Sequence, residues 1–417
     1  MTIENTLDNA QFEPFARQRL IEWWDQRRLA ESQVLVVGAG ALGNEVLKNL
    51  ALVGVGNIYI VDFDIVEPSN LSRSVLFRIG DAGQGYKAEV AARRVSQMHP
   101  YRYAQVAYFH GDLVWELGAG VYRAMDVVLG CLDNVEARRF VNMCCWKAEK
   151  PWIDGAIHKL SGSVAFYTTE TATACYECGV GERLRMLANE RYSCLSGVVR
   201  TNIQAGNEPT TQTSSAIVAA IQTQEAIKVC HGMAIPGGRK VYYNGLLHNF
   251  DVADPSVTSV TEMSVNPACF CHAEDRFGHV TVFNITNTCT VGDLLDLAAQ
   301  EFGMDNPELV FGTFHTSAQG RRFAITAMCP STGYTVELYK PAHQVRDVDV
   351  TRPGECPGEG PEMRLRTLNR LDRSTEFCGY TLGDLGIPNL DIVKIVDGLQ
   401  ERYVQIGQNL QLVFRYV

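Results

Sequence analysis

The sequence predicts an α/β protein in two unequal parts, a doubly wound parallel sheet followed by a smaller α+β module. Three observations lead to this fold class. The chain has 417 residues, more than one core of about 150 residues needs. In the first part, apolar runs rich in β-branched residues alternate with helical stretches, which is typical of a parallel sheet. After Arg276 the pattern changes to several short strands around one helix.

The first part begins with a charged, amphipathic segment. Residues 12–29 carry apolar side chains on one side, which predicts a helical arm. Three apolar runs then predict buried strands: residues 34–37, 58–61 and 126–129. A glycine-rich turn follows the first run, and a helix is expected from there to about Val53. A strand, a glycine turn and a helix in this order open a doubly wound sheet.

The second part is predicted to be an α+β module. Four runs predict its strands: residues 280–285, 309–314, 323–327 and 335–339. The helix is expected at 291–302, with Thr290 and Asp293 as a capping box and Gly303 at its end. We therefore expect three regions, which are a helical arm at 1–30, a main domain at 31–274 and a C-terminal α+β domain at 278–417. For the last region we expect a β-grasp or another docking fold.

Composition and charge disfavour several classes of protein. Lys and Arg number 37 against 47 Asp and Glu, so the net charge of −10 has the wrong sign for a nucleic-acid partner. No apolar run is long enough to cross a membrane, and the polar start gives no signal peptide, which predicts a cytoplasmic location. Thirteen cysteines favour reduced thiols for metal binding or catalysis over a disulfide framework.

The glycine-rich turn predicts a nucleotide site. Gly38, Gly40 and Gly43 lie between a strand and a helix, where missing Cβ atoms let backbone N–H groups approach a phosphate. Asp62 ends the next strand, 19 residues after Gly43 (from 43 to 62), a spacing typical of a carboxylate on a ribose hydroxyl. These two features alone would suggest an NAD enzyme.

Charged side chains that follow argue against hydride transfer. Arg73 and Lys87 are cations, and Asn70 is an amide, within 25 residues of Asp62 (from 62 to 87). Polyphosphate cleavage needs such groups, because charge builds up on the α-phosphate and on the departing pyrophosphate. Asp133 ends another predicted strand and can supply a carboxylate to Mg²⁺. The residues therefore predict a site for ATP and Mg²⁺.

Five motifs together resemble the ubiquitin-activating enzyme superfamily, which includes bacterial enzymes that activate sulfur-carrier proteins for thiamine and molybdopterin synthesis. They are Gly38–Gly43, Asp62-Phe63-Asp64, Asn70-Leu71-Ser72-Arg73, Lys87 and Leu132-Asp133-Asn134. The resemblance implies a Rossmann-like adenylation domain. It also implies that Asp62 holds the ribose and Asp133 the magnesium ion. Asn70, Arg73 and Lys87 would hold the phosphates.

The resemblance covers about residues 12–272 and has further implications. Asp64 and Asn134 belong to the same motifs and are counted with the nucleotide-binding residues. Arg17 matches the N-terminal arginine of the family, which in homodimeric members reaches into the ATP site of the partner. The alternative for Arg17 is a solvated surface charge, because exposed arginines are common.

Two cysteine groups have metal-binding spacing. Cys175 and Cys178 form a C-x-x-C pair that can meet one tetrahedral zinc ion. In the second group Cys269 is joined by either Cys271 or His272, and we favour Cys271 for its thiol. The group resembles the structural zinc site of the family. The alternative is a redox C-x-x-C pair, for which no thioredoxin-like context is present.

Cys194 is the candidate nucleophile. In the related adenylyltransferases this position carries the cysteine that attacks the acyl adenylate, or that joins the sulfur-carrier chemistry. A thiol suits the role because it is a strong nucleophile and its thioester keeps the acyl group reactive. The alternative is a small, buried apolar side chain.

The resemblance implies an enzyme that uses ATP to adenylate the C-terminal glycine of a ubiquitin-like protein, forms a thioester on Cys194 and passes the acyl group to a conjugating enzyme. The compact chain is similar to bacterial versions, some of which serve antiviral conjugation systems. One alternative is a sulfur-carrier adenylyltransferase, although residues 278–417 show no rhodanese-type cysteine loop. An NAD-dependent oxidoreductase is disfavoured by Arg73 and Lys87, and an inactive scaffold is disfavoured by the intact set of ATP motifs.

Overall fold

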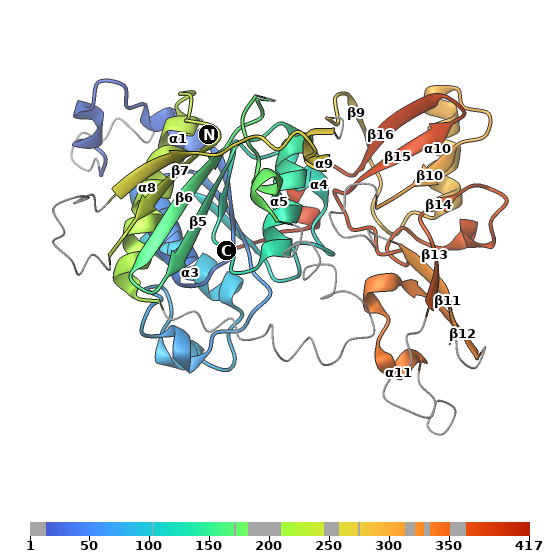
Figure 1. Ribbon diagram of the computed structural model, residues 1–417, viewed down its shortest axis with the longest axis horizontal. Coiled ribbons are helices and arrows are strands. Elements are labelled where there is room, and N and C mark those ends of the chain that lie inside the picture. Colours follow the sequence, from blue (N-terminus) through green and yellow to red (C-terminus); the bar gives the residue numbers. More distant parts are fainter. Residues whose placement is uncertain are drawn as a thin grey trace.

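The structure is a computed structural model, and three sheets organise the residues that it describes (Figure 1). The described ranges are 14–101, 103–170, 172–181, 210–245, 258–273, 276–312, 322–328, 334–350 and 364–417. Within them the sheets have nine, five and three strands. None of the helices in these ranges combines the length and the apolar character needed to cross a bilayer.

The nine-stranded sheet has the order β17-β3-β2-β1-β4-β5-β6-β7-β8. Its strands are β1 (Gln33–Val37), β2 (Asn57–Val61), β3 (Gln105–Phe109), β4 (Val127–Gly130), β5 (Trp152–His158), β6 (Ser161–Tyr167), β7 (Arg239–Tyr243), β8 (Thr258–Glu262) and β17 (Arg415–Tyr416). The strands from β3 to β5 are parallel, and the strands from β6 to β8 continue the sheet in antiparallel pairs. The chain runs outward from β1 in both directions, so the predicted doubly wound sheet is confirmed, with its switch point between β1 and β4.

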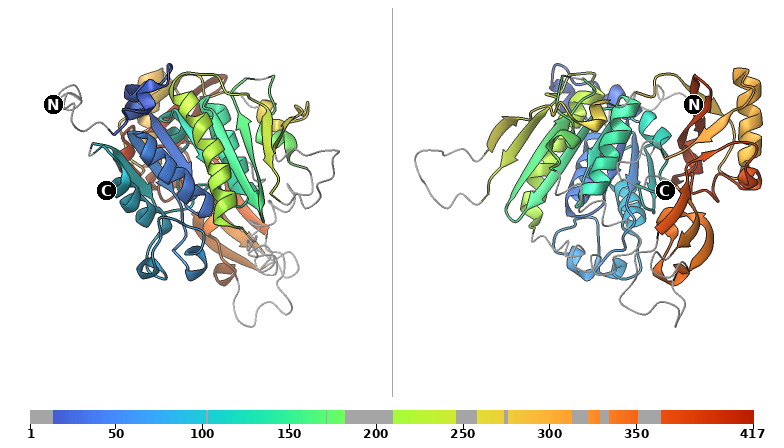
Figure 2. Two further views of the ribbon diagram at one scale, coloured as in Figure 1. Left: turned by 90° about the vertical axis from the view of Figure 1, so that its left-hand side faces the viewer. Right: turned by 45° about the vertical axis from the view of Figure 1, so that its right-hand side comes forward.

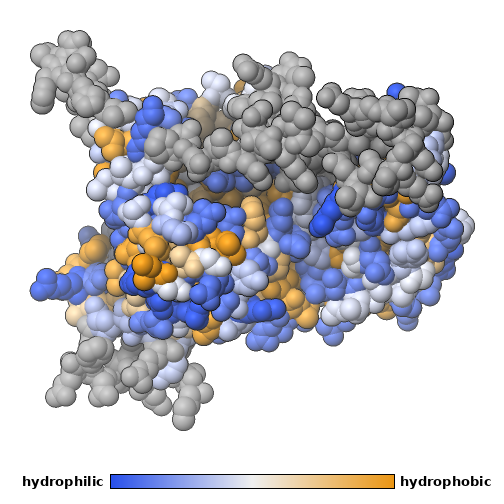
Figure 3. Space-filling view, turned by 90° about the horizontal axis from the view of Figure 1, so that it is seen from below, coloured by the Kyte–Doolittle hydropathy of each residue, from blue (hydrophilic) through white to orange (hydrophobic). Residues whose placement is uncertain are grey.

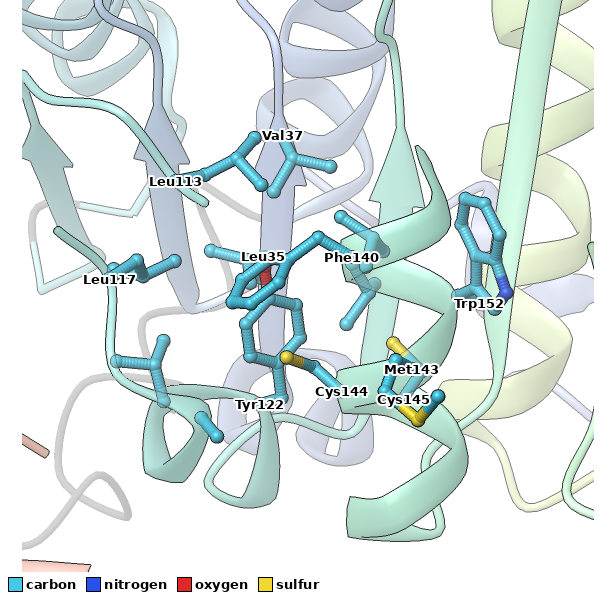
Figure 4. Close-up of a cluster of buried hydrophobic side chains, with 14 of the residues drawn as sticks. Leu35, Val37, Leu113, Leu117, Tyr122, Phe140, Met143, Cys144, Cys145 and Trp152 are labelled. Carbon is cyan, nitrogen blue, oxygen red and sulfur yellow. The ribbon is translucent and has the colours of Figure 1, made fainter. Parts of the chain in front are cut away.

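Helices cover both faces of this sheet (Figure 2). The helices are α1 (Gln26–Glu31), α2 (Ala41–Val53), α3 (Lys87–Met98), α4 (Ala119–Arg123), α5 (Val135–Ala148), α8 (Gln212–Cys230) and the short α9 (Phe270–Ala273). One core joins the sheet to α1, α2, α3 and α8, and a second core joins it to α4 and α5. Figure 4 shows the second core, in which Phe140 and Cys144 of α5 lie near Tyr122 of α4 and Leu35 of β1.

The helical arm predicted over 12–29 is only partly helical in its described residues, which begin at 14. It contains a short 3₁₀ turn, Gln18–Leu20, and only then α1. Asp25 caps the start of α1, because its carboxylate accepts a hydrogen bond from the Arg27 N–H at 2.9 Å. Trp24 supports this start by donating its indole N–H to Gln26 at 2.9 Å.

The five-stranded sheet, with the order β14-β10-β15-β16-β9, carries one long helix, α10 (Val291–Phe302). Its strands are β9 (Val280–Phe283), β10 (Glu308–Val310), β14 (Arg370–Leu371), β15 (Ile392–Asp397) and β16 (Gln400–Ile406). The expected cap of α10 is confirmed, since Thr290 accepts a hydrogen bond from the Asp293 N–H at 3.1 Å and Gly303 ends the helix with a φ of 64°.

The runs at 323–327 and 335–339 do not join that sheet. They belong to β11 (Phe323–Met328) and β12 (Thr335–Pro341), which with β13 (Arg364–Leu368) form the three-stranded sheet beside α11 (Asp347–Val350). The described residues also contain short 3₁₀ helices: Pro68–Asn70, Ile79–Asp81, Tyr176–Gly179, Ala342–Gln344, Glu376–Gly379 and Leu410–Leu412.

The C-terminal region contacts the first region at α4 and at the edge of the nine-stranded sheet. The Gly120 N–H of α4 donates to Leu390 O at 2.7 Å, and Arg123 donates to the Gln405 side chain at 2.7 Å. Farther along the chain, β17 pairs with β3 at the edge of the first sheet. The limits 31–274 and 278–417 stay a prediction, and the last strand lies in the sheet of the first region.

Candidate functional site

The glycine turn joins β1 to α2 at the carboxyl edge of the parallel strands. Gly38 has a φ of 96°, and a Cβ there would lie 2.4 Å from Cys131 O. A Cβ at Gly43 would lie 2.0 Å from Gly38 O. At Gly40 a Cβ would meet no described atom within 4 Å. Gly38 and Gly43 are therefore required by close packing of the turn, whereas Gly40 leaves its outer side open to a ligand.

Asp62, at the end of β2, lies next to this turn. Its two carboxylate oxygens accept hydrogen bonds from the Ala39 N–H at 2.7 Å and from the Asp64 N–H at 2.8 Å. Burial raises the pKa of Asp62 from 3.8 to about 6, although Lys87 lowers it. Each oxygen keeps acceptor capacity, so the carboxylate can still bind the hydroxyl groups of a ribose.

Lys87 is held among carboxylates from two strand ends. It is the first residue of α3, and its ammonium group lies 2.7 Å from Asp64. Burial lowers the pKa of Lys87, but the charges of Asp62, Asp64 and Asp133 raise it by more. The structure therefore brings together four residues singled out in the sequence, with a fixed cation among three acidic groups.

Asn70 and Arg73 lie on the segment between β2 and α3. Asn70 is buried, and its side-chain oxygen accepts a hydrogen bond from the Glu67 N–H at 2.9 Å. The Arg73 guanidinium donates to Ser69 O at 2.8 Å, and its backbone N–H donates to Asn70 O at 3.1 Å. These bonds fix the shape of the segment that carries both residues.

Asn44 is a site residue that the sequence analysis missed. It is fully buried in α2, and its amide donates to Ala39 O at 2.7 Å and to Gly40 O at 3.0 Å. Its side-chain oxygen accepts from the Leu76 N–H at 2.9 Å. Asn44 thus ties the glycine turn to the segment beyond Arg73. An asparagine directly after Gly43, the last glycine of the turn, was the available signal.

Asp133 and Asn134 connect β4 to α5. The Asn134 side chain caps α5 by accepting from the Ala137 N–H at 2.8 Å. Asp133 is exposed, and its carboxylate faces the charge of Lys87. An exposed carboxylate at the switch point, close to the glycine turn, is a suitable oxygen ligand for Mg²⁺ beside bound phosphates.

The candidate metal centre joins two segments that are far apart in the sequence. The ligand atoms of Cys175, Cys178, Cys269 and His272 all lie within 4.8 Å of one another. The Cys175 sulfur is 3.8 Å from that of Cys178 and 3.6 Å from that of Cys269, and Cys178 is 3.9 Å from the His272 Nε2. Zinc bonds of about 2.3 Å in a tetrahedron place ligand atoms about 3.7 Å apart, so these four donors fit one Zn²⁺ ion.

His272 takes the place for which the sequence analysis favoured Cys271. Cys269 and His272 are three residues apart across the helical turn of α9, and this spacing puts them on one side of the turn. Cys271 also approaches Cys175, but its sulfur accepts a hydrogen bond from the Asn142 amide at 3.3 Å. Burial, aided by the charge of Arg276, lowers the pKa of His272, which favours the neutral imidazole that metals bind.

Buried contacts outside the ligands support the metal centre. Arg139 of α5 forms two hydrogen bonds with Glu177, at 2.8 and 3.1 Å, and both side chains are at most 4% exposed. Glu177 lies between Cys175 and Cys178, so this pair anchors the loop to α5. The Trp146 ring stacks on His272 with 4.5 Å between centroids. No local pattern in the sequence indicated these partners.

Two predicted catalytic residues, Arg17 and Cys194, are not part of the group around Lys87 described above. Arg17 is exposed on the arm, at the start of the 3₁₀ turn Gln18–Leu20. Cys194 lies outside the described residues, between Gly181 and Thr210. Just after that range, Gln212 donates to Glu45 of α2 at 3.0 Å. The chain therefore re-enters the described part beside the helix that follows the glycine turn.

Comparison with known proteins gives one family match and several relatives. Residues 12–271 match the ThiF family. Molybdopterin-synthase adenylyltransferase of Escherichia coli (strain K12) is 30% identical over 240 residues, which cover 57% of this chain and 89% of that protein. SUMO-activating enzyme subunit 2 of Dictyostelium discoideum is 36% identical over 152 residues, which cover 36% of this chain and 22% of that protein.

Two further similarities were found. Sulfur carrier protein adenylyltransferase of Thermus thermophilus is 32% identical over 230 residues, which cover 54% of this chain and 79% of that protein. The crystal structure of E. coli MccB with succinimide has a TM-score of 0.48 at 20% identity, covering 62% of this chain and 74% of that chain. The family match includes the glycine turn and ends within α9, so most of the C-terminal region lies beyond it.

Proposed function

The chain belongs to the ThiF family, in the superfamily of ubiquitin-activating enzymes, and we propose that it uses ATP to adenylate the C-terminal glycine of a ubiquitin-like protein. The observation that carries this proposal is the position of Lys87 among Asp62, Asp64 and Asp133 beside the glycine turn. A cation held in this way suits a polyphosphate, and hydride transfer has no use for it.

In the proposed first step, the residues bind and orient ATP. The N-terminus of α2 and the open side of Gly40 receive phosphate oxygens, and Asp62 accepts hydrogen bonds from the ribose. A carboxylate oxygen of the terminal glycine attacks the α-phosphorus, and the bond to the β-phosphate breaks, so that pyrophosphate leaves with the electron pair. Lys87, Arg73 and Asn70 stabilise the charge that builds up on these oxygens.

Asp133 would hold Mg²⁺ at this site. When bound, the ion neutralises phosphate charge, as magnesium does in other nucleotide-cleaving enzymes. The proximity of Asp133 to Lys87 supports the assignment, because carboxylate and ammonium groups would then face the same phosphates.

In the proposed second step, Cys194 takes the acyl group. Its thiolate attacks the carbonyl carbon of the adenylate, a thioester forms and AMP leaves. The cysteine of a conjugating enzyme would then take the acyl group by exchange of one thioester for another. This step depends on the family resemblance, and so does the antiviral setting, which we propose from the compact single chain.

The Cys175, Cys178, Cys269 and His272 group would hold a structural Zn²⁺ ion. Its role is to close the loop after β6 onto α9, since the four ligands come from those two segments. Arg139 already holds the same loop through Glu177, which favours a structural role over a catalytic one.

We propose that the enzyme acts as a homodimer, with Arg17 reaching the ATP site of the partner. Large apolar side chains exposed on the arm and near the site support this proposal. Leu20 is 84% exposed and Ile79 is 86% exposed. Figure 3 views the molecule from below and shows a group of apolar residues on its left-hand part. In Figure 1 the segment between β2 and α3 lies on the same side. We assign a docking role to the C-terminal region.

A sulfur-carrier adenylyltransferase of thiamine or molybdopterin type is the second candidate. The names of two relatives, from Escherichia coli and Thermus thermophilus, favour it. In that case sulfide from a sulfur donor would attack the carbonyl carbon of the same adenylate, so that a thiocarboxylate forms and AMP leaves. An NAD-dependent oxidoreductase is a weaker candidate, because Lys87 and Arg73 have no role in it.

The test uses a diglycine-ending ubiquitin-like protein and two cysteine variants. We expect Cys194→Ala to retain pyrophosphate exchange driven by that protein, because adenylation needs no thiol, and to lose the reductant-sensitive covalent adduct. Cys175→Ala is the matched control, and we expect it to lose zinc and stability together. An adduct that survives in Cys194→Ala and disappears with another cysteine would place the nucleophile elsewhere. If the wild type forms no adduct and thiocarboxylate accumulates instead, the sulfur-carrier function would be favoured.

A further inference from the structure

Arg138 donates a hydrogen bond to the loop that carries Asp133. We propose that Arg138 positions this loop for metal binding. The inference rests on the proposed function, because it concerns the carboxylate that would hold Mg²⁺. Arg138 is the fourth residue of α5, five residues after Asp133 (from 133 to 138). It is a positioning residue in this proposal, since it acts through the backbone of the loop.

The guanidinium group of Arg138 joins the loop to β5. One of its terminal N–H groups donates to Leu132 O, the carbonyl directly before Asp133, and also to Gly155 O at 3.2 Å. Its Nε–H is shared between the two carboxylate oxygens of Asp154, at 3.1 and 3.0 Å. The side chains of Arg138 and Asp154 are only 12% and 7% exposed, so water competes little for these bonds.

Asp154 and Gly155, the residues of β5 that Arg138 contacts, are themselves held in place by their neighbours. A Cβ at Gly130 would lie 2.7 Å from the Asp154 carboxylate, so β4 and Asp154 are in close contact. The Gln222 amide of α8 donates to Gly130 O at 2.9 Å and to Ile153 O at 3.0 Å. Arg138 therefore holds Leu132 against a rigid support rather than against another loop.

The Asp133 carboxylate, by contrast, is exposed. Its contact with the Asn134 amide is long, at 3.4 Å. The direction of an exposed side chain is set mainly by its backbone, and the peptide group between Leu132 and Asp133 is the one whose carbonyl Arg138 holds. Loss of this bond frees that peptide group to rotate, which changes the direction in which the Asp133 carboxylate points.

The test compares Arg138→Lys with Arg139→Lys. The two arginines are neighbours on α5, and each pairs with a carboxylate, but Arg139 pairs with Glu177, which lies between two cysteines of the metal centre. Lysine keeps a positive charge for Asp154, which avoids an unpaired buried carboxylate, yet it lacks the planar fork that reaches Asp154 and Leu132 together. ATP binding is measured by calorimetry with EDTA and with Mn²⁺, and bound Mn²⁺ is counted by electron paramagnetic resonance.

For Arg138→Lys we expect the affinity for Mn²⁺·ATP to fall about tenfold or more, the size of effect usual for partners of metal ligands. Affinity for ATP in EDTA should stay within about twofold of the wild type, since the glycine turn and Asp62 are intact. Excess Mn²⁺ should restore ATP affinity. Arg139→Lys should lower the unfolding temperature and leave the ratio of the two affinities unchanged.

Three results would overturn the inference alone. The first is an affinity of Arg138→Lys for Mn²⁺·ATP that equals that of the wild type. The second is an equal loss of ATP affinity in Arg138→Lys with and without the metal. The third is the same metal-dependent loss of ATP affinity in Arg139→Lys. A wild-type protein that binds no ATP under either condition would overturn the proposed function as well, so the two failures are distinguishable.

Discussion

Asp62 should lower the stability of the nucleotide-free protein at neutral pH. Its carboxylate is desolvated beside the glycine turn, and burial raises its pKa from 3.8 to about 6. Because the folded state binds this proton more tightly than the unfolded state, the stabilising contribution is complete below pH 3.8. It is lost as the pH rises towards and through 6. The full change corresponds to about 3 kcal/mol, at about 1.4 kcal/mol for each tenfold difference in proton affinity.

Asp62→Asn removes this titration. The amide can accept from only one of the Ala39 and Asp64 N–H groups, which costs about 1 kcal/mol or more at every pH. That cost cancels when the difference between variant and wild type is followed across pH. We therefore expect the free energy of unfolding of Asp62→Asn, relative to the wild type, to rise by about 1 to 1.5 kcal/mol between pH 5 and pH 7.5.

Urea unfolding of both proteins at several pH values measures this difference, and titration with ATP on the same samples should show that the more stable variant binds ATP more weakly. Asp305→Asn is the control, because Asp305 is an exposed aspartate in the C-terminal region. A relative stability of Asp62→Asn that stays constant from pH 5 to pH 7.5 would refute the reasoning. In that case the carboxylate ionises without cost and is not held in a desolvated site.

Three further predictions address the other parts of the site. Asp133→Ala should abolish pyrophosphate exchange driven by the ubiquitin-like protein, and exchange at the wild-type rate would contradict the assignment. Arg17→Ala should weaken exchange without affecting folding, and hybrid dimers with Asp133→Ala should recover part of it; confirmed hybrids without recovery would exclude action across a dimer. His272→Ala should lose bound zinc and unfold at a lower temperature, whereas Cys271→Ser should keep its zinc by elemental analysis; the reverse pattern would restore Cys271 as the ligand.

The elements that the sequence predicted share a local signal. The strand, turn and helix around Gly38 follow from an apolar run, three glycines and a helical pattern within about twenty residues. The cap at Thr290 is also encoded by residues three apart, and the structure confirms it. Where the signal was ambiguous even locally, as for Cys271 and His272, the helical turn of α9 decided which side chain meets the other cysteines.

The features that the sequence could not predict depend on partners far along the chain. Arg138 is an ordinary charged residue in a helical pattern until Asp154 and Gly155 of β5 are placed beside it. The role of Asn44 becomes clear only in the fold, where its side-chain oxygen accepts a hydrogen bond from the Leu76 N–H.

The C-terminal region depends on such distant contacts most of all. Leu390 adopts a φ of 59°, which is unfavourable for a leucine, and nothing in the residues around it requires this conformation. Its carbonyl accepts the Gly120 N–H, and a Cβ at Gly118 would lie 2.3 Å from its backbone, so two glycines of the main domain are shaped to receive it. Together with the pairing of β17 and β3, this close fit fixes the C-terminal region against the adenylation sheet. A partner that docks on that region would therefore be held at a fixed distance from the proposed ATP site. The partner itself would then have to be long and flexible enough to reach the acyl group at that site.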